Sequence, residues 1–371
     1  AEARRDTPDR VDYDGLRAAR MDLFRKAWRR SGRQASLPEA CPQLEDYVQF
    51  AALAGEDPGF HRFLQALFFQ QWFALKRYAN DRGVRIIGDL PFYVSPDSTE
   101  VRSTPSLFQL DGRGQPQRVA GVPPDAFSAV GQLWGNPLYD WSGQREALFQ
   151  WWSQRLAWAA RLYDVVRIDH FRGIHTYWSI PAGAADAREG RWERGPGTAL
   201  LDHLARAVPD LPVIAEDLGD LDEAALTFVR ESGLPGMRVL VYAFDPVGES
   251  AYLPHNCPSD AVMYTGTHDT PTFVQWLFEE AMPAERGYCL EYLRLSKEEG
   301  FGWGAIRGAW SSPCRLAIAP LQDVLGLGAD ARTNTPGTVG PANWSWRVRR
   351  EALNQSVADR LRHISRIYRR G

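Results

Sequence analysis

The sequence is poor in lysine and carries little net charge for its 371 residues. Lysine occurs only as Lys26, Lys76 and Lys297, while the other 40 basic residues are arginines, which leaves few candidates for a catalytic lysine. The 43 basic and 46 acidic residues give a net charge of −3. This balance provides no electrostatic reason to expect a nucleic acid or an anionic membrane as a partner.

Cysteine and long apolar runs are also scarce. The four cysteines (Cys41, Cys257, Cys289 and Cys314) have neither metal-ligand nor redox spacing, which favours free thiols in a reducing compartment. Residues 1–10 contain no apolar run of the kind found in a signal peptide, and no segment has the apolar length of a membrane span. These absences predict a soluble, cytoplasmic protein.

Short apolar runs alternate with helical patterns from residue 81 onwards. Six runs have the length and composition of parallel strands that are buried on both faces, namely residues 84–90, 163–168, 211–215, 237–244, 261–265 and 315–320. Helical periodicity separates several of them, at residues 144–162, 198–207, 221–231 and 271–295. This alternation predicts βα units around a parallel sheet.

Polar residues, many of them acidic, follow the apolar runs, as at Asp89, Asp169, Glu216 and Asp269. Carboxylates at the C-terminal ends of successive parallel strands are typical of a (β/α)₈ active site, whereas a doubly wound sheet usually carries a Gly-rich phosphate loop that is absent here. We therefore expect an α/β fold, a (β/α)₈ TIM-type barrel with loop and helical subdomain insertions. Only six strands are recognisable, so the first two βα units are not found in this chain.

This interpretation divides the chain into a helical subdomain (1–80), a portion of a catalytic barrel (81–345) and a C-terminal helix (346–371). A Gly- and Pro-rich loop subdomain (95–143) is inserted into the barrel, and a loop of this length is usually functional. Four aromatic residues of the insertion either form a platform for a sugar or anchor the loop to the barrel, namely Phe127, Trp134, Tyr139 and Trp141.

Arg167 and Asp169 share one face of their strand, because side chains alternate along a strand. The guanidinium then points into the barrel below Asp169, where it needs an anionic partner. Such a cation would lower the pKa of Asp169 and keep the carboxylate ionised, as a nucleophile or a charge stabiliser requires. The alternative is a purely structural salt bridge.

Glu216 is the inward carboxylate of the next strand end, and apolar or aromatic surroundings would raise its pKa, which suits a general acid. Asp269 supplies a third carboxylate, and His170 and His268 each flank one of these acidic residues. Three carboxylates on strand ends fit retaining glycoside chemistry. They could instead bind Mg²⁺ beside a proton-abstracting base, but no lysine lies at a strand end and Arg167 would repel a metal.

Three segments together resemble the catalytic motifs of the 4-α-glucanotransferases, which are the amylomaltases or disproportionating enzymes of the α-amylase-like barrel group. The segments are Val166–Gly173, Ile214–Gly219 and Gly266–Thr270, and residues 88–91, 121–141 and 341–346 are similar to the same family. The resemblance extends from about residue 60 to about residue 350. Its specificity comes from the order and spacing of the motifs.

The resemblance implies transfer of α-1,4-glucan segments to another glucan or to glucose, by a retaining double displacement through a covalent glycosyl-enzyme. It implies that Asp169 is the nucleophile, Glu216 the acid/base and Asp269 the transition-state stabiliser. The sugar contacts that it implies are Arg167, His170, His268, Asp89, Gln132, Trp134 and Asn343. The expected partners are maltooligosaccharides and glucans from starch or glycogen, with no metal and no organic cofactor.

Two departures from the family bear on activity. Ala126 stands where the family's long loop usually carries a tyrosine, which affects acceptor preference and the balance between transfer and hydrolysis. Residues 1–80 match only the helical region that follows the family's first two βα units, so we expect either that a preceding segment completes the barrel or that the fold is remodelled to cover the gap. The alternatives are therefore an α-glucan hydrolase and a non-catalytic glucan-binding fragment.

Overall fold

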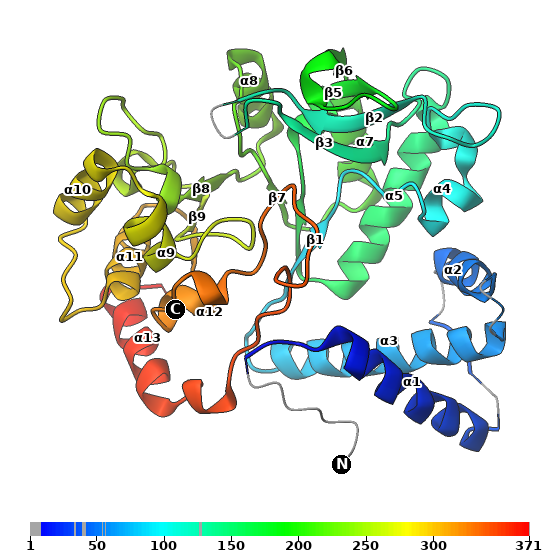
Figure 1. The fold of residues 1–371 in the computed structure, drawn as a ribbon, viewed down its shortest axis with the longest axis horizontal. Coiled ribbons are helices and arrows are strands. Elements are labelled where there is room, and N and C mark those ends of the chain that lie inside the picture. Colours follow the sequence, from blue (N-terminus) through cyan, green and yellow to red (C-terminus); the bar gives the residue numbers. More distant parts are fainter. Residues whose placement is uncertain are drawn as a thin grey trace. The chain divides into compact units, whose positions relative to one another are not determined.

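A computed structural model describes residues 9–32, 35–38, 42–53, 55, 57–125 and 128–370. The chain divides into two compact units, one made of Ala19–Leu234 and the other of Ala1–Ala18 with Pro235–Gly371. The elements of both units are coloured along the sequence in Figure 1. Cys41, Ala126 and Phe127, which the sequence singles out, lie outside the described residues.

The described residues up to position 80 contain three helices, α1 (Tyr13–Arg30), α2 (Pro42–Ala52) and α3 (Pro58–Asn80), and the predicted helical subdomain (1–80) stays a prediction. The side chain of Asp57 caps α3 by accepting a hydrogen bond from a backbone amide of the first turn. Gly83 follows this helix with a φ of +73°, a conformation that glycine adopts without steric cost.

All six predicted parallel strands are present, and they form two three-stranded sheets. The unit Ala19–Leu234 contains the order β1-β4-β7, built from β1 (Ile87–Leu90), β4 (Val165–Ile168) and β7 (Val213–Ala215). The other unit contains the order β10-β9-β8, built from β8 (Met237–Val239), β9 (Val262–Tyr264) and β10 (Leu316–Ile318). A parallel α/β architecture is confirmed, and the eight-stranded barrel stays a prediction.

Helices lie between or after the parallel strands in both units. In the unit Ala19–Leu234 they are α4 (Thr99–Ser103), α5 (Arg145–Leu162), α6 (Arg172–His175), α7 (Thr198–Ala207) and α8 (Glu223–Ser232). In the other unit they are α9 (Phe273–Gln275), α10 (Pro283–Tyr292), α11 (Phe301–Trp310), α12 (Leu321–Val324) and α13 (Gln355–Ile367). A π-helical turn over Trp276–Glu280 directly follows α9. The predicted C-terminal helix corresponds to α13, whereas α11 was not predicted.

A four-stranded antiparallel sheet is inserted between the βα units, with the order β3-β2-β5-β6. Its strands are β2 (Arg118–Val122), β3 (Gln132–Pro137), β5 (Thr176–Pro181) and β6 (Arg191–Arg194). The first two strands come from the loop insertion that precedes β4, and the other two come from the segment after β4. Figure 1 shows this sheet as the cyan-green and green strands at the upper right of the view.

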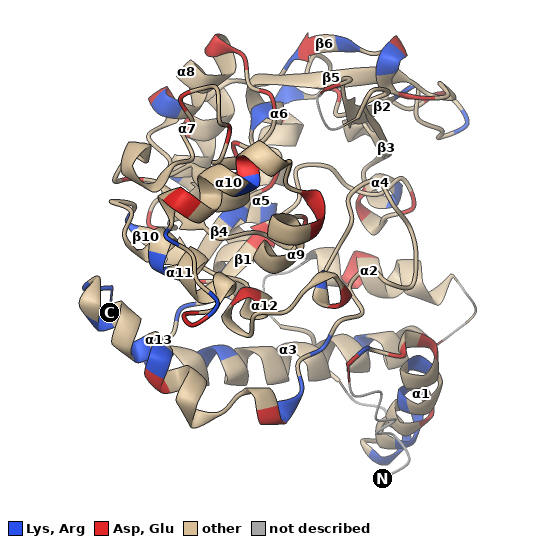
Figure 2. Cartoon of the chain, turned by 60° about the vertical axis from the view of Figure 1, so that its left-hand side comes forward, with Lys and Arg blue, Asp and Glu red and all other residues tan. Residues whose placement is uncertain are grey.

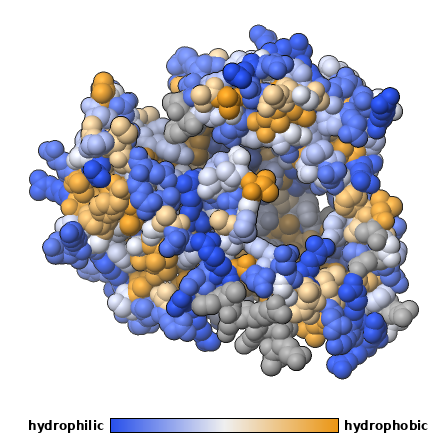
Figure 3. Space-filling view, viewed as in Figure 1, coloured by the Kyte–Doolittle hydropathy of each residue, from blue (hydrophilic) through white to orange (hydrophobic). Residues whose placement is uncertain are grey.

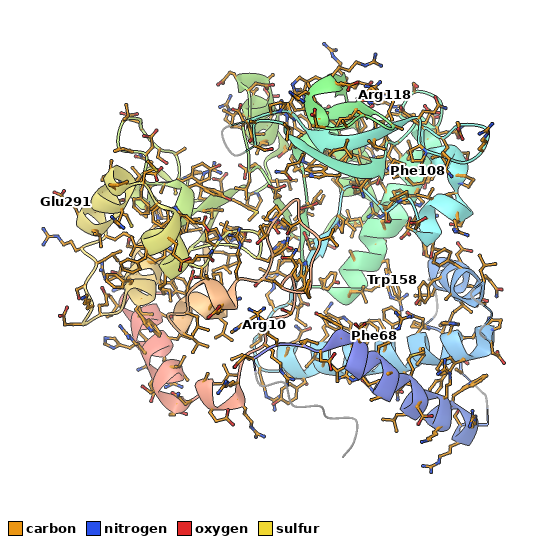
Figure 4. The ribbon with its side chains drawn as sticks, in the orientation of Figure 1. Arg10, Phe68, Phe108, Arg118, Trp158 and Glu291 are labelled. Carbon is orange, nitrogen blue, oxygen red and sulfur yellow. The ribbon has the colours of Figure 1, made fainter. Side chains whose placement is uncertain are left out.

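The core of the unit Ala19–Leu234 is strongly aromatic. Tyr139 and Trp141 are buried, at 1% and 9% exposure, and belong to the same cluster as Trp152 of α5. These two residues therefore anchor the inserted segment, whereas Trp134 on β3 keeps 36% of its surface exposed. Trp158 of α5 packs edge-on against a phenylalanine of α3, and Figure 4 labels it above that helix.

Charged and apolar residues are mixed on the surfaces that the figures show. Along α1 and α13, which Figure 2 colours by charge, basic residues outnumber acidic ones and occur in the last turn of each helix. On the face in Figure 3, hydrophobic residues form separate groups between hydrophilic ones. Among the residues that the structure describes, no helix combines the length and apolar character needed to cross a membrane.

Candidate active site

The parallel register of β1 and β4 places Asp89 directly opposite Arg167. Arg167 donates from Nε to Asp89 Oδ1 (2.8 Å) and from Nη2 to Asp89 Oδ2 (2.9 Å), a bidentate ion pair. The strand can approach its neighbours closely because residue 88 is glycine: a Cβ there would lie 2.0 Å from the ring of Tyr163. The sequence had suggested Asp89 only as a sugar contact, and the pairing with Arg167 needed the register.

Asp169 lies one step beyond the end of β4 and contacts the same cation. Arg167 Nη2 donates to Asp169 Oδ1 at 3.1 Å, which confirms the contact expected from strand periodicity. Burial lowers the pKa of Arg167, but the hydrogen bond and charge of Asp89, with the charges of Asp169 and Glu216, raise it above its usual range. Arg167 is 11% exposed and Asp169 is 41% exposed, so the cation is enclosed while the carboxylate is open to solvent.

Glu216 follows β7 and is held by two backbone amides. His170 N donates to Oε2 (2.7 Å) and Leu218 N donates to Oε1 (3.1 Å). Burial and the negative charge of Asp169 raise the pKa of Glu216 to about 7, although Arg167 and the two amides act in the opposite direction. The predicted rise in pKa therefore occurs, and its leading causes are burial and a second carboxylate.

His170 connects the strand ends to the inserted sheet. Its φ of +46° is unusual for a residue other than glycine, and such strain is concentrated at functional sites. The imidazole ring lies edge-on to Trp134 with ring centroids 4.9 Å apart, and Trp134 Nε1 donates to Gln132 Oε1 at 3.1 Å. Burial and the charge of Arg172 lower the pKa of His170 to about 4, so the ring is neutral at physiological pH.

The Nε2 atom of His170 is buried and has no hydrogen-bond partner among the described residues. An unsatisfied buried polar atom is costly, and at a functional site it is often completed by a ligand. The structure thus brings together His170, Gln132 and Trp134, three of the residues for which the motifs implied sugar contacts. Trp134 is the exposed aromatic residue of this group.

Asp269 lies in the other unit, in the loop after β9. His268 Nε2 is 3.2 Å from Asp269 Oδ2, and Asn334 Nδ2 donates to Asp269 Oδ1 at 2.7 Å. Arg332 Nη2 donates to the backbone carbonyl of Asp269 at 3.2 Å. Asn334 and Arg332 could not be found from the sequence, because they are more than 60 positions away from Asp269 and do not end a strand.

Asn343 uses its side chain within its own loop. Its Oδ1 accepts from Thr335 N (3.1 Å), and its Nδ2 donates to the carbonyl (3.1 Å) and the hydroxyl (3.0 Å) of Thr338. This amide shapes the turn between residues 335 and 343. The expectation that Asn343 contacts a sugar stays a prediction.

The strand ends of β4 and β7 therefore carry two carboxyl groups in contrasting surroundings. Asp169 is held on a buried arginine, whereas Glu216 keeps its proton up to a pH of about 7. Such divergence is how a protein obtains a nucleophile and an acid from two similar side chains. A glycosidic bond is one target on which both groups can act.

Comparison with known proteins gives one family. Residues 45–353 match the family model described as 4-alpha-glucanotransferase. The 4-alpha-glucanotransferase of Clostridium butyricum is 43% identical over 316 residues, which cover 85% of this chain and 65% of that protein. The enzyme of Thermus thermophilus is 40% identical over 403 residues, covering 96% of this chain and 80% of the relative. The chain thus spans less than two thirds of the C. butyricum protein.

A solved structure gives the same answer. The amylomaltase from Streptococcus agalactiae, determined in complex with acarbose, superposes with a TM-score of 0.91 at 35% identity, over 99% of this chain and 81% of the other. The amylomaltase from Corynebacterium glutamicum shares the fold, with a TM-score of 0.78 at 19% identity. With the family model matching more than half of its residues, this chain belongs to the 4-alpha-glucanotransferase family.

Proposed function

We propose that this protein transfers segments of α-1,4-glucan from a donor maltooligosaccharide to an acceptor glucan or glucose, with retention of configuration. Membership of the 4-alpha-glucanotransferase family supports the reaction class. The relative from S. agalactiae was solved with acarbose, and an oligosaccharide ligand in that protein supports a glucan substrate here.

The observation that carries the proposal is the state of Glu216. Its pKa of about 7 leaves much of the carboxyl group protonated near neutral pH, and burial together with the charge of Asp169 is the cause. A general acid works best when its pKa lies near the working pH. Asp169 has the opposite character, since its partner is the enclosed guanidinium of Arg167.

In the first step, the carboxylate of Asp169 attacks C1 of a donor glucosyl unit. The C1–O4 bond breaks, and Glu216 gives its proton to the departing oxygen. In the second step, the ionised Glu216 takes the proton from the 4-hydroxyl of the acceptor, whose oxygen attacks C1 and releases Asp169. Two displacements restore the original configuration and regenerate both carboxyl groups.

The remaining assignments rest on the motifs. We propose that Asp269 stabilises the transition state, because the segment Gly266–Thr270 matches the family's third motif. Arg167, with Asp89, would orient the nucleophile. His170 with its unpartnered Nε2, and Trp134 beside it, would hold the glucosyl unit that reacts.

Incubating the purified chain with maltotriose tests the proposal, with chromatography of glucose and of all maltodextrins over time. We expect glucose together with products longer than maltotriose, because transfer conserves the number of glycosidic bonds. Glucose and maltose alone would identify a hydrolase. An unchanged substrate that nevertheless binds in calorimetry would identify a glucan-binding protein, and either outcome would overturn the proposed transfer.

A further inference from the structure

One aromatic residue near Asp269 has an unusual backbone. Trp344 has a φ of +58°, in the left-handed region that a bulky side chain rarely adopts. Strain of this kind costs on the order of 1 kcal/mol or more and persists only where the surroundings impose it. Glycine or asparagine would adopt the same conformation at a lower cost.

The contacts on either side of Trp344 impose the strained backbone. Trp344 N donates to the carbonyl of Thr333 at 2.6 Å, and the carbonyl of Trp344 accepts a hydrogen bond from the hydroxyl of Tyr13. The next residue, Ser345, is buried at 2% exposure and accepts from Arg10 Nη1 at 2.9 Å. Arg10, which Figure 4 labels, lies just before α1 and forms an isolated antiparallel bridge with Trp346.

The indole of Trp344, in contrast, is directed outward. Its surface is 53% exposed, and its ring centroid lies 5.2 Å from that of His268 with an angle of 37° between the planes. His268 in turn contacts Asp269 through Nε2, at 3.2 Å from Oδ2. The strained backbone of Trp344 therefore places a half-exposed indole against His268, the residue that contacts the carboxylate of Asp269.

We propose that the Trp344 indole, together with the His268 ring, forms a stacking subsite for a glucosyl unit of the glucan chain next to Asp269. One face of a pyranose ring presents a patch of C–H groups, which packs well on a flat aromatic surface that stays partly wet. This subsite rests on the proposed function, because the glucan is the ligand that it would hold.

A purely structural role for the indole does not account for these observations. A residue that packs the fold is enclosed, as Ser345 and the ring of Phe273 are in the same unit. The loop itself is shaped by the amide of Asn343 and by backbone contacts, none of which uses the Trp344 side chain. The side chain therefore adds strain without adding enclosure, and a ligand-contacting role explains why it is there.

The test compares Trp344→Gly and Trp344→Phe with Trp192→Ala. Trp192 on β6 is a matched control, since it is 40% exposed, contacts Arg172 and belongs to no proposed site. Each variant is measured for maltotriose turnover. Each is also combined with Asp169→Asn, which removes the nucleophile, and titrated with maltoheptaose by calorimetry.

We expect Trp344→Gly to raise the KM for maltotriose and the Kd for maltoheptaose about tenfold, with kcat within about twofold. The melting temperature should not fall, because glycine removes the backbone strain. Trp344→Phe should keep most of the affinity, and Trp192→Ala should keep all of it.

Two results would overturn the subsite. Unchanged KM and Kd in Trp344→Gly would show that no sugar stacks on the indole. A lower melting temperature with unchanged Kd would assign the indole a packing role. A different failure is also distinguishable. If the unmodified chain shows no turnover and the single variant Asp169→Asn binds no maltoheptaose, the proposed function is refuted, and the subsite with it.

Discussion

Asp169 and Asp269, which belong to different units, are held by different chemistry. Asp169 is paired with a guanidinium that is 11% exposed and that Asp89 also binds in bidentate fashion. Asp269 accepts its strong hydrogen bond from a neutral amide, Asn334 Nδ2, at 2.7 Å, with His268 at its other oxygen. One aspartate thus has an enclosed cation as a partner, and the other has neutral and titratable donors.

This difference indicates different requirements on the two carboxylates. A nucleophile has to stay ionised and correctly aimed through two covalent steps, and a fixed cation provides both. A residue that stabilises charge on a sugar ring profits from partners that fix its orientation without neutralising it. Glu216 completes the contrast, because two backbone amides hold it and, among the described residues, no cation forms an ion pair with it.

The largest expected effect comes from the strand ends themselves. Asp169→Asn and Glu216→Gln should each reduce maltotriose disproportionation by at least about 10³-fold, since each removes a group that the proposed mechanism uses in the bond-breaking step. Circular dichroism should report an unchanged fold for both variants. Turnover close to that of the unmodified chain in either variant would remove the assigned roles.

Replacing Arg167 by Met removes the cation that pairs with Asp89 and Asp169. It should cost about 2 kcal/mol of stability, because two carboxylates lose their partner while remaining partly solvated. Arg167 lowers the pKa of Glu216, so its loss should move the alkaline limb of the pH–rate profile to higher pH.

Arg118→Met is the matched control for this prediction. Arg118 on β2 is similarly enclosed, at 21% exposure, and pairs with Glu193 in the inserted sheet, where Figure 4 labels it. It should lower stability without moving either limb of the pH–rate profile. If the pH–rate profile is also unchanged in Arg167→Met, the ion pairs of Arg167 have only a structural role.

Replacing Asn334 by Ala removes the neutral amide that donates to Asp269. The substitution should lower kcat about tenfold with little change in KM, because Asn334 would then no longer orient the carboxylate of Asp269. Asn354→Ala, at the N-cap of α13, serves as the control because its side chain accepts from Val357 N and contacts no proposed site residue. That variant should lower the melting temperature and leave kcat unchanged, and an equal kcat in both variants would contradict the positioning role.

The smallest effect is a change in how stability depends on pH. The pKa of Glu216 is raised from 4.5 to about 7, so the folded state retains a proton that the unfolded state has lost between these values. Stability from this group is therefore lost as the pH rises from about 4.5 to 7. Glu216→Gln should accordingly melt a few degrees higher than the unmodified chain at pH 8, and at the same temperature at pH 4.

Glu193→Gln is the control of opposite sign. Burial raises the pKa of Glu193, but the hydrogen bonds from Arg191, Ser179 and Tyr177 together lower it by more than burial raises it. The net pKa of Glu193 is therefore below its ordinary value. This carboxylate stabilises the fold at pH values above its unfolded pKa, and that contribution is lost on acidification. Its variant should melt at a lower temperature at pH 8, and a shift of the same sign in both variants would refute the contrast.

Local periodicity was enough to predict the parallel strands and the contact between Arg167 and Asp169, because side chains two residues apart on a strand share a face. The pairing of Arg167 with Asp89 could not be predicted, since the register between strands almost 80 residues apart is set by tertiary packing.

Helix α11 is a helix that could not be predicted from local sequence, because its glycines serve tertiary packing. Its segment contains Gly302, Gly304 and Gly308, which disfavour a helix in isolation. In the folded chain a Cβ on the first would lie 2.2 Å from the carbonyl oxygen of Asp323, and a Cβ on the second 2.3 Å from Leu295. The glycines are there for close packing, which no local pattern reports.

The sequence by itself determined the parallel strands, the acidic strand ends and the family of this protein, because hydrophobic periodicity and the order of short motifs are local properties. The tertiary structure was needed for the other neighbours of these groups, namely Asp89 as a second partner of Arg167, backbone amides for Glu216 and an amide for Asp269. Burial and the charges of neighbours distant in sequence set a carboxyl group's pKa, and folding alone brings those neighbours together.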